Sequence, residues 1–318
     1  MNIGLLGFGV VGGGVWELAQ ENRALNVKKV LVRREAPSLG KAAVQDVEAI
    51  LRDTEIDTVV EVLGGLHPAY EWICRALAAG KDVVTANKAV ISAYYRELTA
   101  LARENGVALR CTAAVGGGIP WLVNLQRCRR VDTVTEVGGI MNGTTNFIMD
   151  AMARQGADFP AVLQRAQELG YAEADPSADI DGDDIRRKLT ISANIAFDAL
   201  LREEDIPAFG IRTVTGADVA DFRAHGFTCK LLACAQRTET GVAAYVEPAL
   251  VAEGEPEAAV PGNYNLISCT GELLGRQSYF GQGAGRYPTA ANVVQDCLDL
   301  LTGEDGFYTE TARPMAVE

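Results

Sequence analysis

Lysines and carboxylates are the side chains of this sequence best placed for proton-transfer chemistry. Lys188 closes an acid-rich stretch, residues 170–188, and Asp184 lies four positions before it, on the same face of an expected helix. Lys88 ends the segment 84–88, directly after an apolar strand pattern, where ligands bind in open α/β sheets. Lysine titrates where arginine does not, which favours a chemical role for both. The alternative for Asp184 and Lys188 is a surface ion pair worth about 0.3–0.5 kcal/mol.

Histidine and cysteine offer little to a catalytic or metal site. The two histidines are isolated and the seven cysteines include no CxxC pair, which argues against a zinc site of the usual spacing and against a disulfide framework. No tyrosine has a lysine four positions later, as a short-chain dehydrogenase requires, and no cysteine is a convincing nucleophile. His67 is an acid/base candidate in principle, but an exposed loop histidine is the simpler interpretation. Residues 181–184 lack the glycine spacing and closing glutamate of a calcium-binding EF-hand loop.

A GxGxxG motif near the start of the chain predicts a dinucleotide site. Its residues are Gly7, Phe8, Gly9, Val10, Val11 and Gly12. The motif follows a strand and opens a helix, so Gly7 permits a tight turn, Gly9 lets the backbone approach a pyrophosphate, and Gly12 lets the helix pack closely. The alternative is a tight strand-to-helix turn that binds nothing.

Two arginines stand where an NAD-specific site usually has an acidic residue, about 20 residues beyond the glycines. Arg33 and Arg34 end the second expected strand. Because guanidinium groups bind phosphate through charge-assisted hydrogen bonds, the pair predicts a preference for NADP over NAD. A solvated strand end is the alternative.

Alternating strand and helix patterns predict a parallel sheet built from βαβ units up to residue 115. The expected strands are 3–6, 27–33, 58–63, 82–85 and 107–111, and the expected helices are 12–24, 44–52, 68–80 and one ending at 104. After the loop 116–120 the pattern changes, with expected strands 131–140, 242–250 and 265–269 and helices at 146–154, 161–168 and from 184. We therefore expect an α/β protein with a Rossmann-type domain and an α+β domain, divided near residue 128.

Charge and hydropathy restrict the partners. A formal net charge of -13 disfavours binding to nucleic acid. The N-terminus has no signal-peptide pattern, and no apolar run reaches the roughly 18 residues of a spanning helix. These features predict a cytoplasmic protein that binds neither nucleic acid nor membrane.

The acid-rich stretch and several glycine-containing segments resemble homoserine dehydrogenases. The matching segments are 61–65, 85–88, 116–120, 139–146, 166–188 and 281–290, in order along nearly the whole chain. The resemblance implies reversible NAD(P)-linked reduction of L-aspartate 4-semialdehyde to L-homoserine, in threonine and methionine biosynthesis. It also implies a nucleotide domain of residues 1–128 completed by 285–318, a catalytic and dimerisation domain of residues 129–284, and a homodimer formed through the catalytic domain's sheet.

The resemblance assigns roles to individual residues. Lys188 becomes the proton donor, and Lys88 lies between nicotinamide and substrate. The residues implied to bind substrate are Glu173, Asp179, Asp184, Gly143, Thr144 and Tyr171. The residues implied to bind the cofactor are those of the glycine motif together with Arg33, Arg34, Thr85, Lys88 and Gly285.

One position departs from the family pattern. Members commonly have a glutamate three residues before Val115 that helps bind a monovalent cation, whereas this chain has Thr112. The carbonyls of Val115, Gly117 and Ile119 could still bind sodium, but we expect the site to be weakened or empty. The 318 residues leave no room for an appended regulatory module, so threonine feedback through one is not expected.

Two other functions compete with this one. One is another NAD(P)-dependent amino-acid or hydroxy-acid dehydrogenase, which the stretch ending at Lys188 disfavours. The other is a catalytically silent NADP-binding regulator. That alternative predicts loss of Lys88, Lys188, Glu173 or Asp184, and all four are present.

Overall fold

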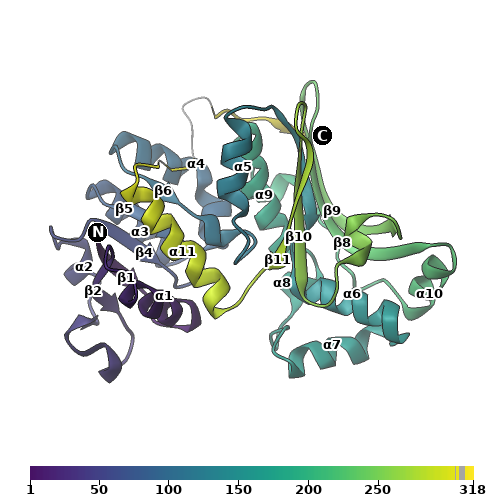
Figure 1. The fold of residues 1–318 in the computed structure, drawn as a ribbon, viewed down its shortest axis with the longest axis horizontal. Helices are drawn as coiled ribbons and strands as arrows, with labels where there is room; N and C mark the ends of the chain where they lie inside the picture. Colours follow the sequence, from purple (N-terminus) through teal and green to yellow (C-terminus); the bar gives the residue numbers. More distant parts are fainter. Residues whose placement is uncertain (305, 308–311) are drawn as a thin grey trace. The chain divides into compact units, whose positions relative to one another are not determined.

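The computed structural model describes residues 1–304, 306–307 and 312–318, and they form two compact units (Figure 1). Unit 1 comprises residues 1–123 and 284–312, and unit 2 comprises residues 124–283 and 313–318. Residues 305 and 308–311 of the predicted C-terminal segment lie outside the described part. The predicted α/β class, with a parallel sheet and a second, mixed sheet, is confirmed.

Unit 1 contains a six-stranded parallel sheet in the order β3-β2-β1-β4-β5-β6. Its strands are β1 (Asn2–Leu6), β2 (Asn26–Leu31), β3 (Ala43–Val44), β4 (Thr58–Glu61), β5 (Asp82–Thr85) and β6 (Leu109–Arg110). Its helices are α1 (Val10–Gln20), α2 (Glu48–Leu51), α3 (Ala69–Ala78), α4 (Lys88–Glu104) and α11 (Arg286–Leu301), with short 3-10 turns at Pro37–Ala42 and Thr112–Ala114. The strand order reverses between β1 and β4, where open α/β sheets bind ligands.

Unit 2 contains a six-stranded sheet in the order β11-β10-β7-β8-β9-β12, antiparallel except for β12, which runs parallel to β9. Its strands are β7 (Val134–Ile140), β8 (Phe227–Arg237), β9 (Gly241–Ala252), β10 (Tyr264–Gly271), β11 (Gly275–Gln282) and β12 (Ala316–Val317). Its helices are α6 (Gly143–Gln155), α7 (Phe159–Glu168), α8 (Ser177–Ile180), α9 (Asp183–Phe197) and α10 (Gly216–Ala224), with 3-10 turns at Glu203–Asp205 and Pro256–Ala259.

Several expected boundaries were wrong. The expected helix 44–52 is reduced to Glu48–Leu51, because Ala43 and Val44 instead extend the sheet beside Val30 and Leu31. The expected boundary near residue 128 falls inside α5 (Trp121–Arg129), and the two units divide between residues 123 and 124. Residues 313–318 belong to unit 2 rather than unit 1, because β12 pairs with Gly241 and Val242 of β9.

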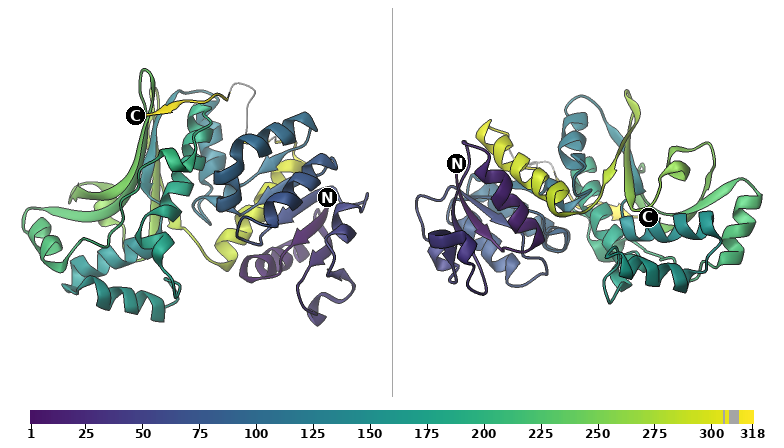
Figure 2. Two further views of the ribbon diagram at one scale, coloured as in Figure 1. Left: turned by 180° about the vertical axis from the view of Figure 1, so that it is seen from behind. Right: turned by 60° about the horizontal axis from the view of Figure 1, so that its bottom comes forward.

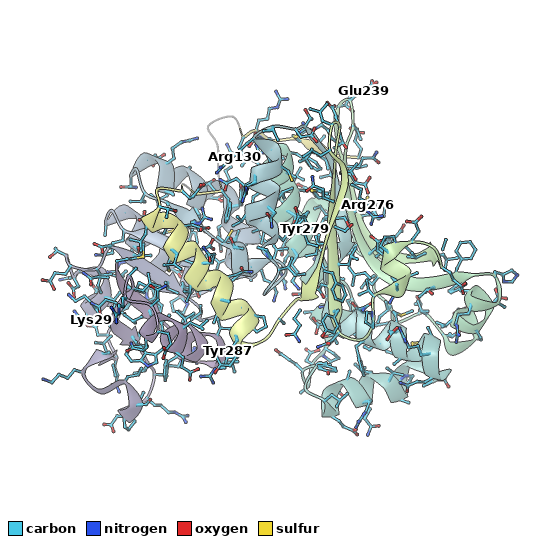
Figure 3. All side chains as sticks on the ribbon, in the orientation of Figure 1. Lys29, Arg130, Glu239, Arg276, Tyr279 and Tyr287 are labelled. Atoms are coloured by element: carbon cyan, nitrogen blue, oxygen red, sulfur yellow. The ribbon has the colours of Figure 1, made fainter. Side chains whose placement is uncertain are left out.

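The sequence pattern did not predict helix α11, although the resemblance assigned residues 285–318 to the nucleotide domain, and this helix completes unit 1. Its apolar side, Ala290, Val293 and Cys297, joins the core formed by β1, β2 and α1. Figure 2 shows α11 lying along α1. Tyr287, labelled in Figure 3, donates a hydrogen bond to Glu17 of α1 at 2.9 Å. A segment more than 250 residues from the glycine motif therefore supports the first helix of the nucleotide fold.

Within the described residues, no helix combines the length and apolar character needed to cross a bilayer.

Candidate functional site

The glycine motif forms the turn between β1 and α1. Gly7 has a φ of +107°, which side chains rarely tolerate, and a Cβ on Gly12 would lie 2.2 Å from the Gly7 carbonyl oxygen. A Cβ on Gly9 would meet nothing within 4 Å. Gly7 and Gly12 are therefore required by the fold, whereas Gly9 leaves open space over the start of α1. Phe8, Val10 and Val11 complete the turn and the first residues of the helix.

Two glycines beyond the motif, which the sequence did not single out, allow α11 to approach α1. A Cβ on Gly14 would lie 2.9 Å from the Ala290 Cβ, and one on Gly13 would lie 3.1 Å from the Arg286 guanidinium. Arg286 is paired with Glu17 of α1 at 2.6 Å. Gly285, predicted to contact the cofactor, is the exposed N-cap residue of α11.

The two predicted phosphate-binding arginines lie just past the end of β2. Arg33 and Arg34 are exposed, and neither guanidinium has a hydrogen bond or ion pair to any described residue. A hollow of about 350 Å³ opens beside them and is lined by Val32, Glu35, Ala36, Pro37, Gly40, Ala43 and Gln45. Glu35 contributes a negative charge to the lining of this hollow. The hollow attracts an anion only if the positive charges of the two arginines outweigh the charge of Glu35.

The carboxyl ends of β4 and β5 carry a buried polar network. The Thr85 hydroxyl donates to Glu61 Oε2 at 2.5 Å, and the Asn87 amide donates to Glu61 Oε1 at 3.4 Å and to the Gly65 carbonyl at 2.8 Å. Burial raises the pKa of Glu61, and the bonds from Thr85, Leu63 and Asn87 oppose the shift. Asn87 also caps α4 by accepting from the Val90 amide. Glu61 and Asn87 lay inside matched segments but were not predicted as site residues.

Lys88 is the first residue of α4 and is half-buried. The network around Asn87 sets the start of that helix, so it also sets the position of the Lys88 backbone at the carboxyl edge of the sheet.

A second polar cluster, in unit 2, surrounds the N-terminus of α6. Lys188 Nζ lies 2.7 Å from Asp184 Oδ2 and donates to the Met141 carbonyl at 2.7 Å. The Asn142 amide donates to Asp179 Oδ1 at 2.7 Å and to Asp184 Oδ2 at 2.8 Å. Lys188, Asp184 and Asn142 are all buried, so the Asp184–Lys188 pair is no surface ion pair. Asn142 was missed as a site residue, although it lies in the matched segment 139–146.

Repulsion between carboxylates acts within this cluster. Asp179 and Asp184 both lie near the ammonium of Lys188. Burial and repulsion by Asp184 raise the pKa of Asp179, while Asn142, Lys188 and Thr144 oppose the shift. A bound cation beside Asp179 would relieve this repulsion, so the cluster is suited to a ligand ammonium.

The other predicted substrate residues divide between this cluster and its surroundings. The Thr144 hydroxyl donates to the Tyr171 carbonyl at 2.6 Å, and Gly143 is the first residue of α6. The Tyr171 ring packs edge-on against Phe147 and remains 40% exposed. Glu173 lies on an exposed loop, and its carboxylate has no hydrogen bond or ion pair with any residue the structure describes. The structure thus brings Gly143, Thr144, Asp179, Asp184 and Lys188 together and leaves Glu173 outside.

The residues predicted to hold a cation belong to unit 1. Thr112 lies in the 3-10 turn after β6, and Val115, Gly117 and Ile119 follow it in a buried loop.

Two family models match the chain. One, described as homoserine dehydrogenase, matches residues 120–298, and the other, described as the homoserine dehydrogenase NAD binding domain, matches residues 7–112. The chain belongs to the homoserine dehydrogenase family. It is therefore an NAD(P)-dependent oxidoreductase acting on a CH–OH group, and it binds a nicotinamide cofactor. This outcome confirms the predicted family and sets aside the silent regulator and the other dehydrogenases.

Individual relatives agree with the family models. A homoserine dehydrogenase of Synechocystis sp. is 42% identical over 317 residues, covering 95% of this chain and 73% of that protein. The solved homoserine dehydrogenase of Thiobacillus denitrificans is 37% identical, with a TM-score of 0.96 over 100% of this chain and 79% of that one. A hyperthermophilic archaeal homoserine dehydrogenase solved in complex with NADPH is 25% identical, with a TM-score of 0.81 over 95% of this chain and 98% of that one.

Proposed function

We propose that Lys188 is the proton donor in reversible reduction of L-aspartate 4-semialdehyde to L-homoserine. The observation that carries this role is the buried ammonium of Lys188, held at 2.7 Å by both Asp184 and the Met141 carbonyl. A reduced nicotinamide supplies the hydride when bound. Negative charge then develops on the aldehyde oxygen, and a positioned ammonium stabilises the charge and donates a proton to it. In the reverse direction, the neutral lysine accepts the hydroxyl proton.

We propose that the carboxylates beside Lys188 bind the substrate ammonium. Asp179 and Asp184 are fixed by the Asn142 amide, so little reorganisation is needed when the ligand arrives. Glu173 and Tyr171, on the adjoining exposed loop, are proposed as further contacts at the edge of the site. Gly143 and Thr144 present the start of α6 to the substrate. Lys88 and Thr85, at the other unit's sheet edge, are proposed as contacts on the nicotinamide side.

We propose that NADPH is preferred over NADH. The unpaired guanidinium groups of Arg33 and Arg34, at the end of β2 beside a hollow, support this choice. The solved archaeal relative contains NADPH, which is consistent with it.

A direct assay of nicotinamide oxidation tests both the reaction and the choice of cofactor. Purified protein is expected to oxidise NADPH on addition of L-aspartate 4-semialdehyde, with kcat/KM about tenfold or more above that for NADH. Absorbance at the nicotinamide band measures both rates. Lack of oxidation with either cofactor would contradict the reaction, whereas equal or faster oxidation of NADH would contradict only the cofactor choice.

The Asp179→Asn substitution tests the ammonium site. At neutral pH it is expected to raise the KM for homoserine about 10- to 100-fold, because a bond to a charged group is lost. It should also raise Tm by roughly 2–5 °C, because it removes the half-buried charge that Asp184 repels. The pKa of Asp179 is higher in the folded protein than in the unfolded chain. Ionisation of Asp179 therefore destabilises the folded protein fully at pH values above the folded-state pKa, and not at all at pH values below the unfolded-state pKa. The gain in Tm should therefore shrink as pH falls.

Asp183→Asn is the matched control. Asp183 is the neighbouring carboxylate, partly exposed and paired with Arg186 at 2.7 Å, so its loss should leave KM nearly unchanged. An Asp179→Asn protein with unchanged KM and a lower Tm would sink the proposal that Asp179 awaits an ammonium.

We propose a homodimer formed through the sheet of unit 2. One face of this sheet is incompletely covered: Phe280 is 55% exposed and Tyr245 39%, whereas Ile267 and Val246 on the opposite face are buried. Arg276, labelled in Figure 3, lies on the same strand as Phe280 and pairs with Glu257. Light scattering on the purified chain distinguishes a monomer from a dimer.

We also propose a cytoplasmic location. The structure records the seven cysteines as free thiols, and a reducing compartment maintains thiols in that state. Cell fractionation followed by immunodetection is the corresponding measurement.

A further inference from the structure

A buried asparagine occupies the place that the family resemblance assigns to a monovalent cation. The Asn292 amide nitrogen donates to the Gly117 carbonyl at 2.6 Å and to the Ile119 carbonyl at 3.0 Å. Asn292 lies on α11 and exposes only 6% of its surface. Carbonyl oxygens only accept hydrogen bonds, so the amide nitrogen and not its oxygen must face them. A cation that approached these two carbonyls from the same side would compete with that nitrogen.

A buried carboxylate on the same helix is already committed to other partners. Asp296, one turn further along α11, accepts from the Thr112 amide at 2.8 Å and the Thr112 hydroxyl at 2.7 Å. It also accepts from Arg110 Nε at 3.0 Å, and Arg110 pairs in addition with Asp299 at 2.8 Å. Thr112 therefore orients Asp296 instead of supplying an anionic ligand.

The charged groups near the loop are paired with one another. Arg110 is almost fully buried and pairs with both Asp296 and Asp299, so a cation that the chain itself supplies already engages these carboxylates. The residues present do not fit a sodium or potassium ion. They instead satisfy the same carbonyls with the two N–H groups of a neutral amide.

We propose that Asn292 replaces the monovalent cation, so that this homoserine dehydrogenase needs neither sodium nor potassium for stability or activity. The amide links the loop 115–120 to α11, which packs on α1 of the nucleotide fold. It thereby provides by hydrogen bonding the connection that a shared ion would provide by coordination.

A salt series on the unmodified protein tests the proposal directly. Tm and the kcat/KM for homoserine are measured in sodium, potassium and choline chloride at equal ionic strength. Both quantities should agree among the three salts within experimental error. An increase of several degrees in Tm, or a rate increase of twofold or more, in sodium or potassium over choline would overturn the proposal. Because Tm requires no turnover, this result is independent of the proposed catalytic roles.

The isosteric substitution Asn292→Asp should create the cation dependence that the natural chain lacks. A carboxylate facing two carbonyl oxygens is repelled by them, and a bound cation would relieve that repulsion. The variant should therefore melt several degrees higher in sodium chloride than in choline chloride. Asn105→Asp is the matched control, because the Asn105 amide also donates to a backbone carbonyl, that of Leu101, but at an exposed helix end.

The variants also separate the outcomes. If Asn292→Asp responds to cations no more than Asn105→Asp, these carbonyls do not form a latent cation site and the proposal fails. If Asn292→Asp does not fold, the double variant Thr112→Glu, Asn292→Ala replaces it. In this variant the glutamate at position 112 supplies a carboxylate and the alanine leaves the space of the amide empty. Its Tm should also respond to sodium more strongly than the Tm of Asn105→Asp.

Discussion

Replacing Lys188 by alanine is expected to lower kcat for aspartate 4-semialdehyde reduction about 10²–10⁴-fold, the usual contribution of a positioned general acid. The ammonium is buried at 2.7 Å from both Asp184 and the Met141 carbonyl, so the substitution removes the positioned acid from the cluster. Cofactor binding should not change, because the glycine motif belongs to the other unit. Steady-state rates and a fluorescence titration with NADPH measure the two effects separately.

Two further variants make the Lys188 result specific. Lys188→Arg keeps the positive charge but donates a proton far less readily at neutral pH, so it should restore Asp184 pairing and not turnover. Arg187→Ala removes the adjacent cation, which lies 3.5 Å from Glu203, and should leave kcat within about twofold of the natural chain. Turnover near the natural value in Lys188→Ala would refute the proton-donor role.

Gly9→Ala is expected to weaken NADPH binding about tenfold or more without changing the fold. Gly9 has φ and ψ of -84° and -154°, which alanine also adopts, and its added Cβ would meet nothing within 4 Å. The methyl group would instead occupy the space over α1 that we propose for the pyrophosphate. Titration with NADPH gives the affinity, and thermal melting without cofactor gives the stability.

Gly12→Ala is the contrasting variant. Its Cβ would lie 2.2 Å from the Gly7 carbonyl oxygen, so the turn or the helix must move and Tm should fall even without cofactor. The two substitutions add the same methyl group three residues apart, one against solvent and one against backbone. Unchanged NADPH affinity in Gly9→Ala would show that the pyrophosphate does not approach this glycine.

Local patterns were sufficient to predict the parallel sheet and the meeting of Asp184 with Lys188. The short apolar runs and the GxGxxG turn predicted a parallel sheet, because strand alternation and glycine geometry depend on neighbouring residues. The four-residue spacing of Asp184 and Lys188 predicted that they meet on one helix face, and the structure pairs them at 2.7 Å. The resemblance then identified the family, which the family models confirm.

Contacts between distant segments needed the tertiary structure. Helix α11 joins α1 across more than 250 residues, and β12 leaves the expected domain to pair with β9; neither partner is visible in a local pattern. Glu173 lies in the same acid-rich stretch as Asp179, yet only Asp179 turns inward to Asn142.

The loop 115–120 shows most clearly the difference between what residue types predict and what tertiary contacts decide. Residue identity alone shows that Thr112 supplies no anionic ligand, because a side chain's charge follows from its residue type. It did not determine what compensates for the loss, since Asn292 is 180 positions away and an asparagine on a helix has no preferred long-range partner. Only the packing of α11 against the loop 115–120 brings its amide to the Gly117 and Ile119 carbonyls. Residue types determined the available chemistry, and burial together with chain geometry decided which groups meet.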